Sequence, residues 1–338
     1  MLFRSGGAIT LQTTQNQLIN NATVQANGTS HGGNIQMSTT QGDINLQSAL
    51  IQTNGAAGRG GQIAIAATNY TSIESSTVEA TGYTQGGTIK VGNDAQNLVL
   101  PFSILTNLDA NSILNTSQTN LANTTNGGYI ETSGQTINLL SSINAGRGGM
   151  WLLDPTSVTI STTSGTSTGT DPLLFTNQTN VSASQIQTAI NSGVSVQIIT
   201  DGTITQSSAL AFNVTANGST PSLTLDTRSG SIQSITTAAI TDTSSGTGSG
   251  VTLNIYTAGG AVTLGATQLK GSLNVDNTFA VNGSTSGFIT INNAGTYANS
   301  SASGIAIPSN LNISGSINLK SVTNASNIVA SEIGRAHV

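Results

Sequence analysis

The sequence predicts an all-β protein of the β-solenoid class. Three observations lead to this prediction: a Gly-Gly-x-Ile motif returns at nearly constant spacing, apolar and polar residues alternate after each copy, and only 6% of residues are charged whereas 36% are hydrophobic. A motif that returns after about 20 to 50 residues is typical of solenoids, whose coils stack on one another. Alternation over a short stretch is the pattern of a β-strand with one buried face.

The Gly-Gly-x-Ile motif occurs five times before residue 131. The copies are Gly6-Gly7-Ala8-Ile9, Gly32-Gly33-Asn34-Ile35, Gly60-Gly61-Gln62-Ile63, Gly86-Gly87-Thr88-Ile89 and Gly127-Gly128-Tyr129-Ile130. The first four begin 26, 28 and 26 residues apart. Glycine allows a turn with positive φ and places no side chain against the next coil. We therefore expect a structural role for Gly32, Gly33, Gly60, Gly61, Gly86, Gly87, Gly127 and Gly128.

Each period of the repeat contains two predicted strands. One follows the motif, as in Ile35-Gln36-Met37, and a second lies midway through the period. The midway stretches are Thr23–Gly28, Leu50–Gly55 and Thr77–Gly82. One coil is therefore predicted to run strand, turn, strand and glycine-rich turn, with β-branched residues filling the inner face.

The spacing of the motif predicts three regions. Residues 6–149 are expected to form regular coils with an insertion at 97–126, a loop or an aberrant coil, because the motif jumps from residue 86 to residue 127. Residues 150–170 are expected to be a transition segment. Residues 171–331 are expected to form a looser β-solenoid, because their strand-like stretches come at irregular intervals.

Both ends of the chain are expected to be foreign to the protein. Ile333-Gly334-Arg335-Ala336-His337-Val338 is what a common sequencing adapter encodes, and Leu2-Phe3-Arg4-Ser5 matches the opposite adapter. We therefore expect residues 1–5 and 332–338 to be adapter-derived, and residues 6–331 to be a slice of a longer reading frame.

One short helix is predicted at residues 182–191. Ser182 or Ser184 can cap its start, Ile186, Ala189 and Ile190 share one face, and Gly193 can end it. Further strands are predicted at Val194–Ile198, Leu223–Leu225, Val251–Ile255, Val262–Leu264, Leu273–Val275, Phe288–Ile291 and Ile317–Leu319.

Composition excludes several classes of site. The chain has no cysteine, so it forms no disulfide and no thiolate metal site. Its eight Lys and Arg residues are spread over the whole length, which argues against nucleic acid and anionic membranes as partners. No apolar run approaches the roughly 18 residues that span a bilayer, so no membrane insertion is expected.

Residues suited to catalysis are few and scattered. His31 lies beside a glycine pair, where an exposed turn residue is expected. Glu74 and Glu79 come closest to a carboxylate pair and are expected on solvated faces of one coil, whereas polysaccharide-cleaving enzymes need two carboxylates at one bond. The chain contains no calcium-binding Gly-Gly-x-Gly-x-Asp repeat. We expect no enzyme activity, no cofactor and no metal.

Two short motifs resemble RNA-binding RGG boxes. They are Ala57-Gly58-Arg59-Gly60-Gly61 and Ala145-Gly146-Arg147-Gly148-Gly149. Both lack the interleaved aromatic residues on which bases stack, so we interpret them as coil turns.

The segment Met150-Trp151-Leu152-Leu153-Asp154-Pro155 contains the only tryptophan. An exposed Trp151 could stack on a sugar, and a buried Trp151 could fill the interior where the coil geometry changes. The flanking leucines favour the buried interpretation, so Trp151, Asp154 and Pro155 are expected to be structural.

The Gly-Gly-x-Ile coils, Glu131-Thr132-Ser133-Gly134, Trp151-Leu152-Leu153-Asp154-Pro155 and a helix ending Ala189-Ile190-Asn191-Ser192-Gly193 together resemble a known family. It comprises the two-partner-secretion exoproteins of Gram-negative bacteria, the filamentous-haemagglutinin-like and high-molecular-weight adhesins. The resemblance covers nearly all of residues 6–331. It implies a right-handed parallel β-helix that leaves the cell through an outer-membrane β-barrel transporter and acts at the cell surface or extracellularly.

Within this resemblance we expect an internal, non-enzymatic stalk segment of a surface adhesin, with adhesive loops such as 97–126 meeting a surface receptor. The alternatives are the stalk of a contact-dependent-inhibition toxin and a biofilm matrix protein that associates laterally with itself. A polysaccharide-cleaving β-helix is the least favoured. Some members of the family are glycosylated on Asn-x-Ser/Thr sites, which makes candidates of Asn21, Asn27, Asn69, Asn115, Asn123, Asn177, Asn213 and Asn282.

Overall fold

The computed structural model describes residues 5–93, 100–120, 125–162, 179–228, 233–258, 260, 262–276 and five short strands beyond them, with side chains up to residue 275. The expected adapter-derived ends lie outside the described residues, except for Ser5. The chain divides into two compact units. The first comprises residues 1–156 and 163–196, and the second comprises residues 157–162 and 197–338.

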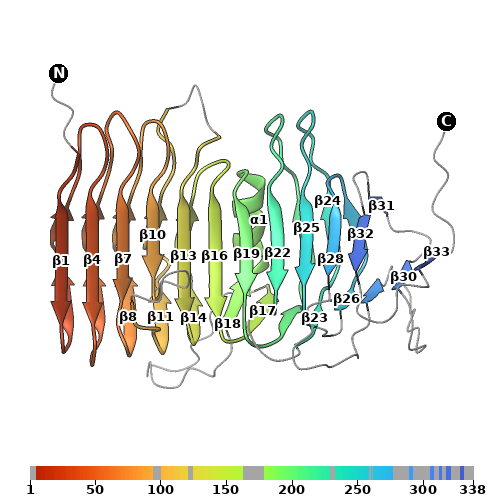
Figure 1. Ribbon diagram of the computed structural model, residues 1–338, viewed down its shortest axis with the longest axis horizontal. Coiled ribbons are helices and arrows are strands. Elements are labelled where there is room, and N and C mark those ends of the chain that lie inside the picture. Colours follow the sequence, from red (N-terminus) through yellow and green to blue (C-terminus); the bar gives the residue numbers. More distant parts are fainter. Residues whose placement is uncertain are drawn as a thin grey trace. The chain divides into compact units, whose positions relative to one another are not determined.

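The first unit is built from three parallel sheets (Figure 1). The first sheet contains β1 (Ala8–Thr13), β4 (Asn34–Thr39), β7 (Gln62–Ala66), β10 (Thr88–Val91), β13 (Tyr129–Gly134) and β16 (Met150–Pro155). The second contains β2 (Gln17–Asn20), β5 (Ile44–Gln47), β8 (Tyr70–Glu74), β11 (Leu105–Leu108) and β14 (Thr136–Leu139). The third contains β3 (Thr23–Gln25), β6 (Leu50–Gln52), β9 (Thr77–Glu79), β12 (Ile113–Asn115) and β15 (Ser142–Asn144). Each of the first five coils adds one strand to each sheet, so the predicted all-β, solenoid-like architecture is confirmed.

The prediction of two strands per coil is wrong, because each of the first five coils has three. The unpredicted strands belong to the second sheet. Ile44-Asn45-Leu46-Gln47, for example, alternates strictly and buries Ile44 and Leu46. Four residues are too few for a clear periodicity in the sequence, and the stacking of neighbouring coils supplies the stability that the short strand lacks alone.

The segment at 97–126, expected to be a loop or an aberrant coil, contains two strands in its described part. β11 pairs in register with β8 and β14, and β12 pairs with β9 and β15. The described part of the segment therefore continues the second and third sheets. Residues 97–99 and 121–124, which belong to the same expected insertion, lie outside the described residues.

The interior of the first unit is built from ladders of apolar side chains. In the first sheet, equivalent positions of successive coils lie opposite one another. One such row consists of Ile9, Ile35, Ile63, Ile89, Ile130 and Trp151. Trp151 is completely buried and lies opposite Ile130. Gly148-Gly149-Met150-Trp151 is thus a further copy of the motif, with Trp in place of Ile. Stacked β-branched residues suit these positions because they pack well on a pleated surface.

The glycine pairs are required for close packing rather than for positive φ. A Cβ on Gly33 would lie 2.0 Å from the carbonyl oxygen of Gly7, and a Cβ on Gly61 would lie 2.0 Å from that of Gly33. Only Gly148 among the described motif glycines has positive φ. The structural role expected for these glycines is therefore to let neighbouring coils approach closely. The expectation that they are needed for turns with positive φ is wrong.

Helix α1 (Ala183–Asn191) confirms the predicted helix. Ser182 caps its start by accepting a hydrogen bond from the backbone N–H of Ser184, and Gly193 follows its end with φ of 83°. Its buried face consists of Ala183, Ile186, Ala189 and Ile190. The helix packs against β15 and β18 (Thr179–Ser182), and Gln185 donates a hydrogen bond to the carbonyl oxygen of Ser141.

The second unit also consists of parallel strands. One ladder contains β22 (Ser222–Asp226), β25 (Thr252–Tyr256), β28 (Leu273–Asp276) and β32 (Ile317–Lys320). Another contains β17 (Val158–Ser161), β20 (Ile204–Gln206), β23 (Ile235–Thr236), β26 (Val262–Leu264), β29 (Ile289–Ile291), β30 (Ile305–Ile307) and β33 (Ile328–Ala330). The third contains β21 (Leu210–Phe212), β24 (Ile240–Asp242), β27 (Thr267–Leu269) and β31 (Asn312–Ile313). β19 (Ser195–Ile199) contains the boundary between the units.

Candidate functional site

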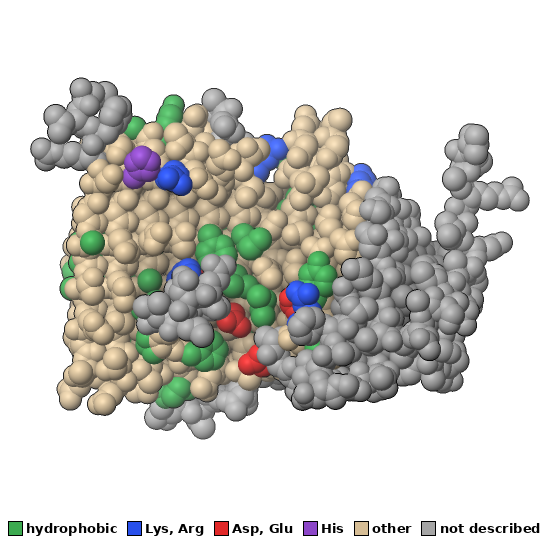
Figure 2. All heavy atoms as spheres, in the orientation of Figure 1, with side chains coloured by type: hydrophobic (Ala, Val, Ile, Leu, Met, Phe, Trp, Pro, Cys, Tyr) green, Lys and Arg blue, Asp and Glu red, His purple; other side chains and the backbone are tan. Residues whose placement is uncertain are grey.

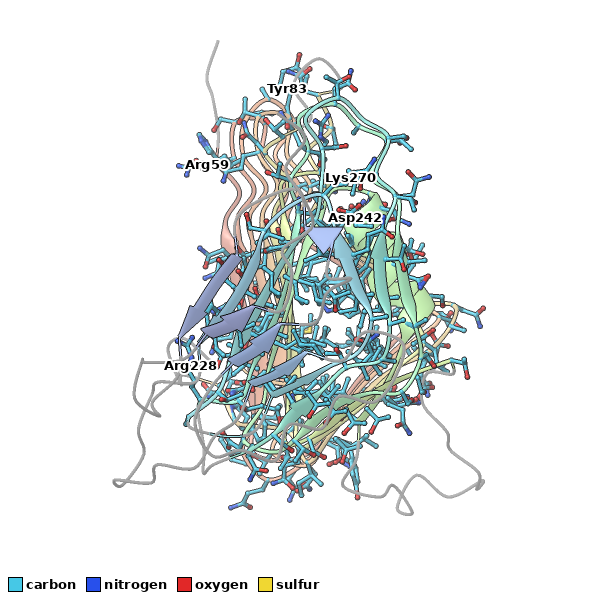
Figure 3. The ribbon with its side chains drawn as sticks, turned by 90° about the vertical axis from the view of Figure 1, so that its right-hand side faces the viewer. Arg59, Tyr83, Arg228, Asp242 and Lys270 are labelled. Atoms are coloured by element: carbon cyan, nitrogen blue, oxygen red, sulfur yellow. The ribbon has the colours of Figure 1, made fainter. Side chains whose placement is uncertain are left out.

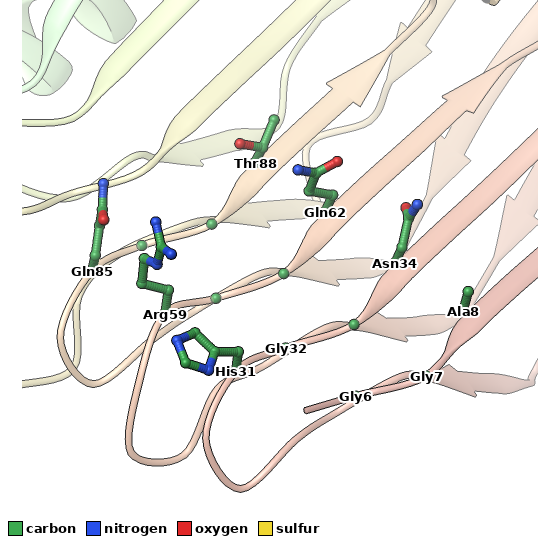
Figure 4. Close-up of a pocket in the computed structure, with 15 residues that line it drawn as sticks. Gly6, Gly7, Ala8, His31, Gly32, Asn34, Arg59, Gln62, Gln85 and Thr88 are labelled. Carbon is green, nitrogen blue, oxygen red and sulfur yellow. The ribbon is translucent and has the colours of Figure 1, made fainter. Parts of the chain in front are cut away.

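An open groove of about 620 Å³ crosses the glycine-rich turns of the first unit (Figure 4). It lies where the turns that follow the third sheet lead into the strands of the first sheet. Its floor is made by the first four glycine pairs, Gly6, Gly7, Gly32, Gly33, Gly60, Gly61, Gly86 and Gly87. Because successive pairs stack on one another, the floor has no side chains over several coils.

Polar side chains border the groove on both sides of the glycine floor. His31, Arg59 and Gln85 precede the glycine pairs, and Figure 4 shows them on the turns. Asn34, Gln62 and Thr88 follow the pairs and stand at the start of β4, β7 and β10. The second row is in exact strand register, since Asn34 lies opposite Gln62 and Gln62 opposite Thr88.

Seven of the eight backbone N–H groups of the floor, all but that of Gly7, donate to carbonyl oxygens within the solenoid. Those of Gly33, Gly61 and Gly87 donate to the carbonyl oxygens of Ala26, Thr53 and Ala80, the residues that directly follow β3, β6 and β9, each at 2.7 Å. Those of Gly32 and Gly60 donate to the next coil at 2.9 and 3.0 Å. A ligand in the groove would therefore be recognised by the bordering side chains and not by free main-chain donors.

The bordering side chains differ from other polar rows of the same unit. On the third sheet, Gln25 Nε2 donates to Gln52 Oε1 at 2.6 Å, and Gln52 Nε2 donates to Glu79 Oε2 at 2.7 Å. On the second sheet, Asn138 Nδ2 donates to Asn107 Oδ1 at 2.7 Å. Asn34 and Gln62 have the same register relationship, yet their amides are not bonded to each other or to another described residue, so they are available to a ligand.

The groove is electrostatically one-sided. No carboxylate is among the residues that line it, whereas Arg59 contributes a guanidinium that no described side chain neutralises. Figure 3 shows Arg59 projecting from its turn at the outside of the unit. Charged side chains are sparse on the face that Figure 2 shows, so a single cation has little competition from neighbouring charges.

The buried carboxylates lie elsewhere and have structural partners. Glu131 is completely buried, accepts hydrogen bonds from Tyr129 and Ser133, and lies 3.9 Å from the ammonium of Lys90. Asp226 accepts both forks of the Arg228 guanidinium at 2.9 and 2.6 Å, and that guanidinium lies 4.3 Å from the ring centroid of Tyr256. These contacts fix strands and turns and leave no oxygen directed at a groove.

Asp242 is a buried carboxylate with four hydrogen bonds. It is completely buried, and its Oδ2 accepts from the backbone N–H groups of Val251 at 2.8 Å and Lys270 at 2.9 Å. Its Oδ1 accepts from the backbone and hydroxyl of Ser244 at 3.0 and 2.5 Å. Figure 3 shows Asp242 and Lys270 close together within the second unit. Its environment could not be predicted from the sequence, because one of its donors, the backbone N–H of Lys270, lies 28 residues away.

The residues considered for catalysis are not brought together. His31 is exposed and its Nδ1 lies 3.1 Å from the hydroxyl of the neighbouring Ser30. Glu74 and Glu79 lie on different sheets, where they accept hydrogen bonds from Gln47 and Gln52. Within the part of the chain that the structure describes, no three His, Cys, Asp or Glu side chains are grouped to hold a metal ion.

The other expected structural residues lie in β16. Trp151 is 0% exposed, Pro155 is buried and Asp154 is partly buried. An exposed sugar-stacking role for Trp151 is incompatible with this burial. The indole Nε1 donates a hydrogen bond to Thr132 Oγ1 at 3.2 Å, which satisfies the polar group of a buried aromatic side chain.

The candidate glycosylation sites have different environments. Asn21 and Asn213 are exposed. Asn27 is also exposed, but its amide bonds to Gln52 and to the backbone of Asn54, and Asn115 accepts from Asn144. Asn69 is partly buried, and Asn123, Asn177 and Asn282 lie outside the described residues.

No helix in the described ranges combines the length and apolar character needed to cross a lipid bilayer. Comparison with protein-family models, with curated proteins and with solved structures found no match to this chain.

Proposed function

We propose that this chain is a segment of the stalk of a large secreted surface adhesin, and that it acts without enzymatic activity. The observation that supports the proposal best is the in-register stacking of the coils, in which the first five coils continue the same three parallel ladders. A stack of this kind grows by adding coils, because each coil contacts only its neighbours. At about 4.8 Å per stacked strand, length increases in proportion to the number of coils.

We further propose that the solenoid is a right-handed parallel β-helix. The support is general: connections between parallel strands of one sheet are right-handed in the great majority of proteins, because strand twist favours that path. Each strand of the first sheet is joined to its neighbour by one coil, as β4 is joined to β7. The coil that leads from β4 to β7 is therefore a connection between parallel strands of one sheet, to which this rule applies.

The surface chemistry is compatible with an extended extracellular protein. Polar ladders such as Gln25, Gln52 and Glu79 satisfy one another along the stack. Such ladders stabilise neighbouring coils with few charged side chains, and net charge is only −5 over 338 residues. Export through an outer-membrane β-barrel transporter and a receptor on another surface belong to the same proposal.

The test is detection of the protein on intact cells of its source organism. An antibody against the purified chain should label unpermeabilised cells, and long sequencing reads across the locus should show an upstream secretion signal beside a β-barrel transporter gene. Antibody binding only after permeabilisation would refute the surface location. A control antibody against a cytoplasmic enzyme establishes that the cells are intact.

A further inference from the structure

We propose that the glycine-floored groove binds a linear acidic polysaccharide, with Arg59, Asn34 and Gln62 as the recognising side chains. The inference rests on the proposed adhesive role for its biological meaning, but binding itself can be measured on the isolated chain. It moves the expected adhesive contact from the segment at 97–126 to a surface made by the coils themselves.

The shape of the groove favours a linear polymer. Its lining repeats over four coils, each with one glycine pair, and three of these coils add one flanking side chain on each side of the pair. Neighbouring coils are about 4.8 Å apart, which is close to the length of one hexose unit in an extended chain. A polymer that lies along the groove can therefore present one unit to each coil.

The chemistry of the lining favours a saccharide over a peptide strand or a lipid. A peptide that extends a sheet needs free main-chain N–H and C=O groups, and seven of the eight floor N–H groups are already bonded within the solenoid. A lipid or an apolar peptide needs apolar side chains, and Ala8 is the only one that lines the groove. Amide groups such as those of Asn34 and Gln62 donate to and accept from hydroxyl groups.

Charge favours an acidic polymer. A guanidinium forms two parallel hydrogen bonds with a carboxylate, and Arg59 has no carboxylate partner among the described residues. The lining contains no Asp or Glu that would repel a uronic acid. The same lack of carboxylates leaves the groove without the pair of acids that glycoside hydrolysis uses, so we expect the polymer to be bound there without hydrolysis.

Polygalacturonate is a suitable probe, since it is linear and carries one carboxylate per sugar. Fluorescently labelled polygalacturonate should bind the full chain in an anisotropy titration. The double variant Arg59→Gln/Gln62→Ala should raise the dissociation constant about tenfold or more, as expected for loss of a charge-assisted contact. Unchanged affinity of this variant, or no binding by the unaltered chain, would overturn the proposal.

Two matched variants serve as controls. Arg147→Gln changes the arginine of the same Ala-Gly-Arg-Gly-Gly motif outside the groove, and Gln25→Ala removes an exposed amide of the third sheet. Both should bind polygalacturonate as the unaltered chain does. If either weakens binding as much as the double variant, the site is not the groove.

Competitors decide the class of ligand. Neutral hydroxyethyl cellulose should compete poorly, and equal competition would refute recognition of the acid group. Poly(U) should also compete poorly, and tighter binding of poly(U) would make the groove a nucleic-acid site and overturn the proposal. Cells that carry the protein at their surface but whose chain binds no polygalacturonate would refute this inference while leaving the proposed stalk function intact.

Discussion

The indole Nε1 of Trp151 donates a hydrogen bond to Oγ1 of Thr132, 3.2 Å away in the preceding coil. Trp151 lies opposite Ile130, and Thr132 lies opposite Leu153, so the bond connects two rungs of the inner ladders of β13 and β16. Both side chains are completely buried. One residue therefore fills the interior and satisfies its polar atom within the same pair of coils.

Replacement of this tryptophan should destabilise the first unit strongly. Trp151→Ala removes a fully buried aromatic side chain, and we expect a loss of about 3–5 kcal/mol in the free energy of unfolding. Urea unfolding followed by circular dichroism measures the change. Trp151→Phe, which keeps most of the apolar volume, should lose less. An unchanged urea midpoint for Trp151→Ala would contradict the buried role.

The glycine pairs allow a comparison between two positions of one motif. A Cβ on Gly32 would lie 1.8 Å from the carbonyl oxygen of Thr53, whereas a Cβ on Gly7 meets nothing within 4 Å. Gly32→Ala should therefore destabilise by about 1–3 kcal/mol or more, because backbone must move. Gly7→Ala should leave the thermal midpoint nearly unchanged. Equal effects of the two substitutions would disprove close packing as the reason for the motif.

The cap of α1 is predicted to contribute measurably. Ser182 is 5% exposed and accepts from the backbone N–H of Ser184, so Ser182→Ala should cost about 1 kcal/mol. Thr188→Ala, at an exposed position within the same helix, should be neutral or slightly stabilising because alanine favours helix. Differential scanning calorimetry of both variants measures the change in stability. A larger loss of stability for Thr188→Ala than for Ser182→Ala would contradict the capping role of Ser182.

The buried carboxylate of Asp242 is expected to require its charge and both oxygens. Asp242→Asn places an NH₂ group against donors whichever way the amide turns, since Oδ1 and Oδ2 each accept from a backbone N–H. We expect a loss of about 2–3 kcal/mol in the stability of the second unit. Asp201→Asn, at an exposed site, is the control. Hydrogen exchange at Val251 and Lys270 should rise in Asp242→Asn alone.

Several elements follow from the sequence because their cause is local or strictly repeated. The Gly-Gly-x-Ile spacing predicts β4, β7 and β10, since the same motif must occupy the same place in each coil. The cap, the apolar face and the closing glycine predict α1, since all three lie within a dozen residues.

The third strand of each coil and the groove could not be predicted in the same way. β5 is only four residues long, and its pairing with β2 and β8 depends on residues 27 positions before and after it. The groove depends on which residues flank the glycine pairs in successive coils, as His31 and Arg59 do. The residues that flank the glycine pairs could be read from the sequence, but only the stacking of the coils shows that they line one groove.

The sequence by itself determined that this chain repeats, that its glycines recur at the turns and that its apolar residues alternate. These properties are local, because they arise from backbone sterics and from burial of one face of each strand. The tertiary structure alone decided that each of the first five coils has three strands, that Trp151 continues the ladder of Ile130, and that Asn34, Arg59 and Gln62 border one groove. Stacking decides these relationships, because it brings together residues that are more than 20 positions apart in the chain.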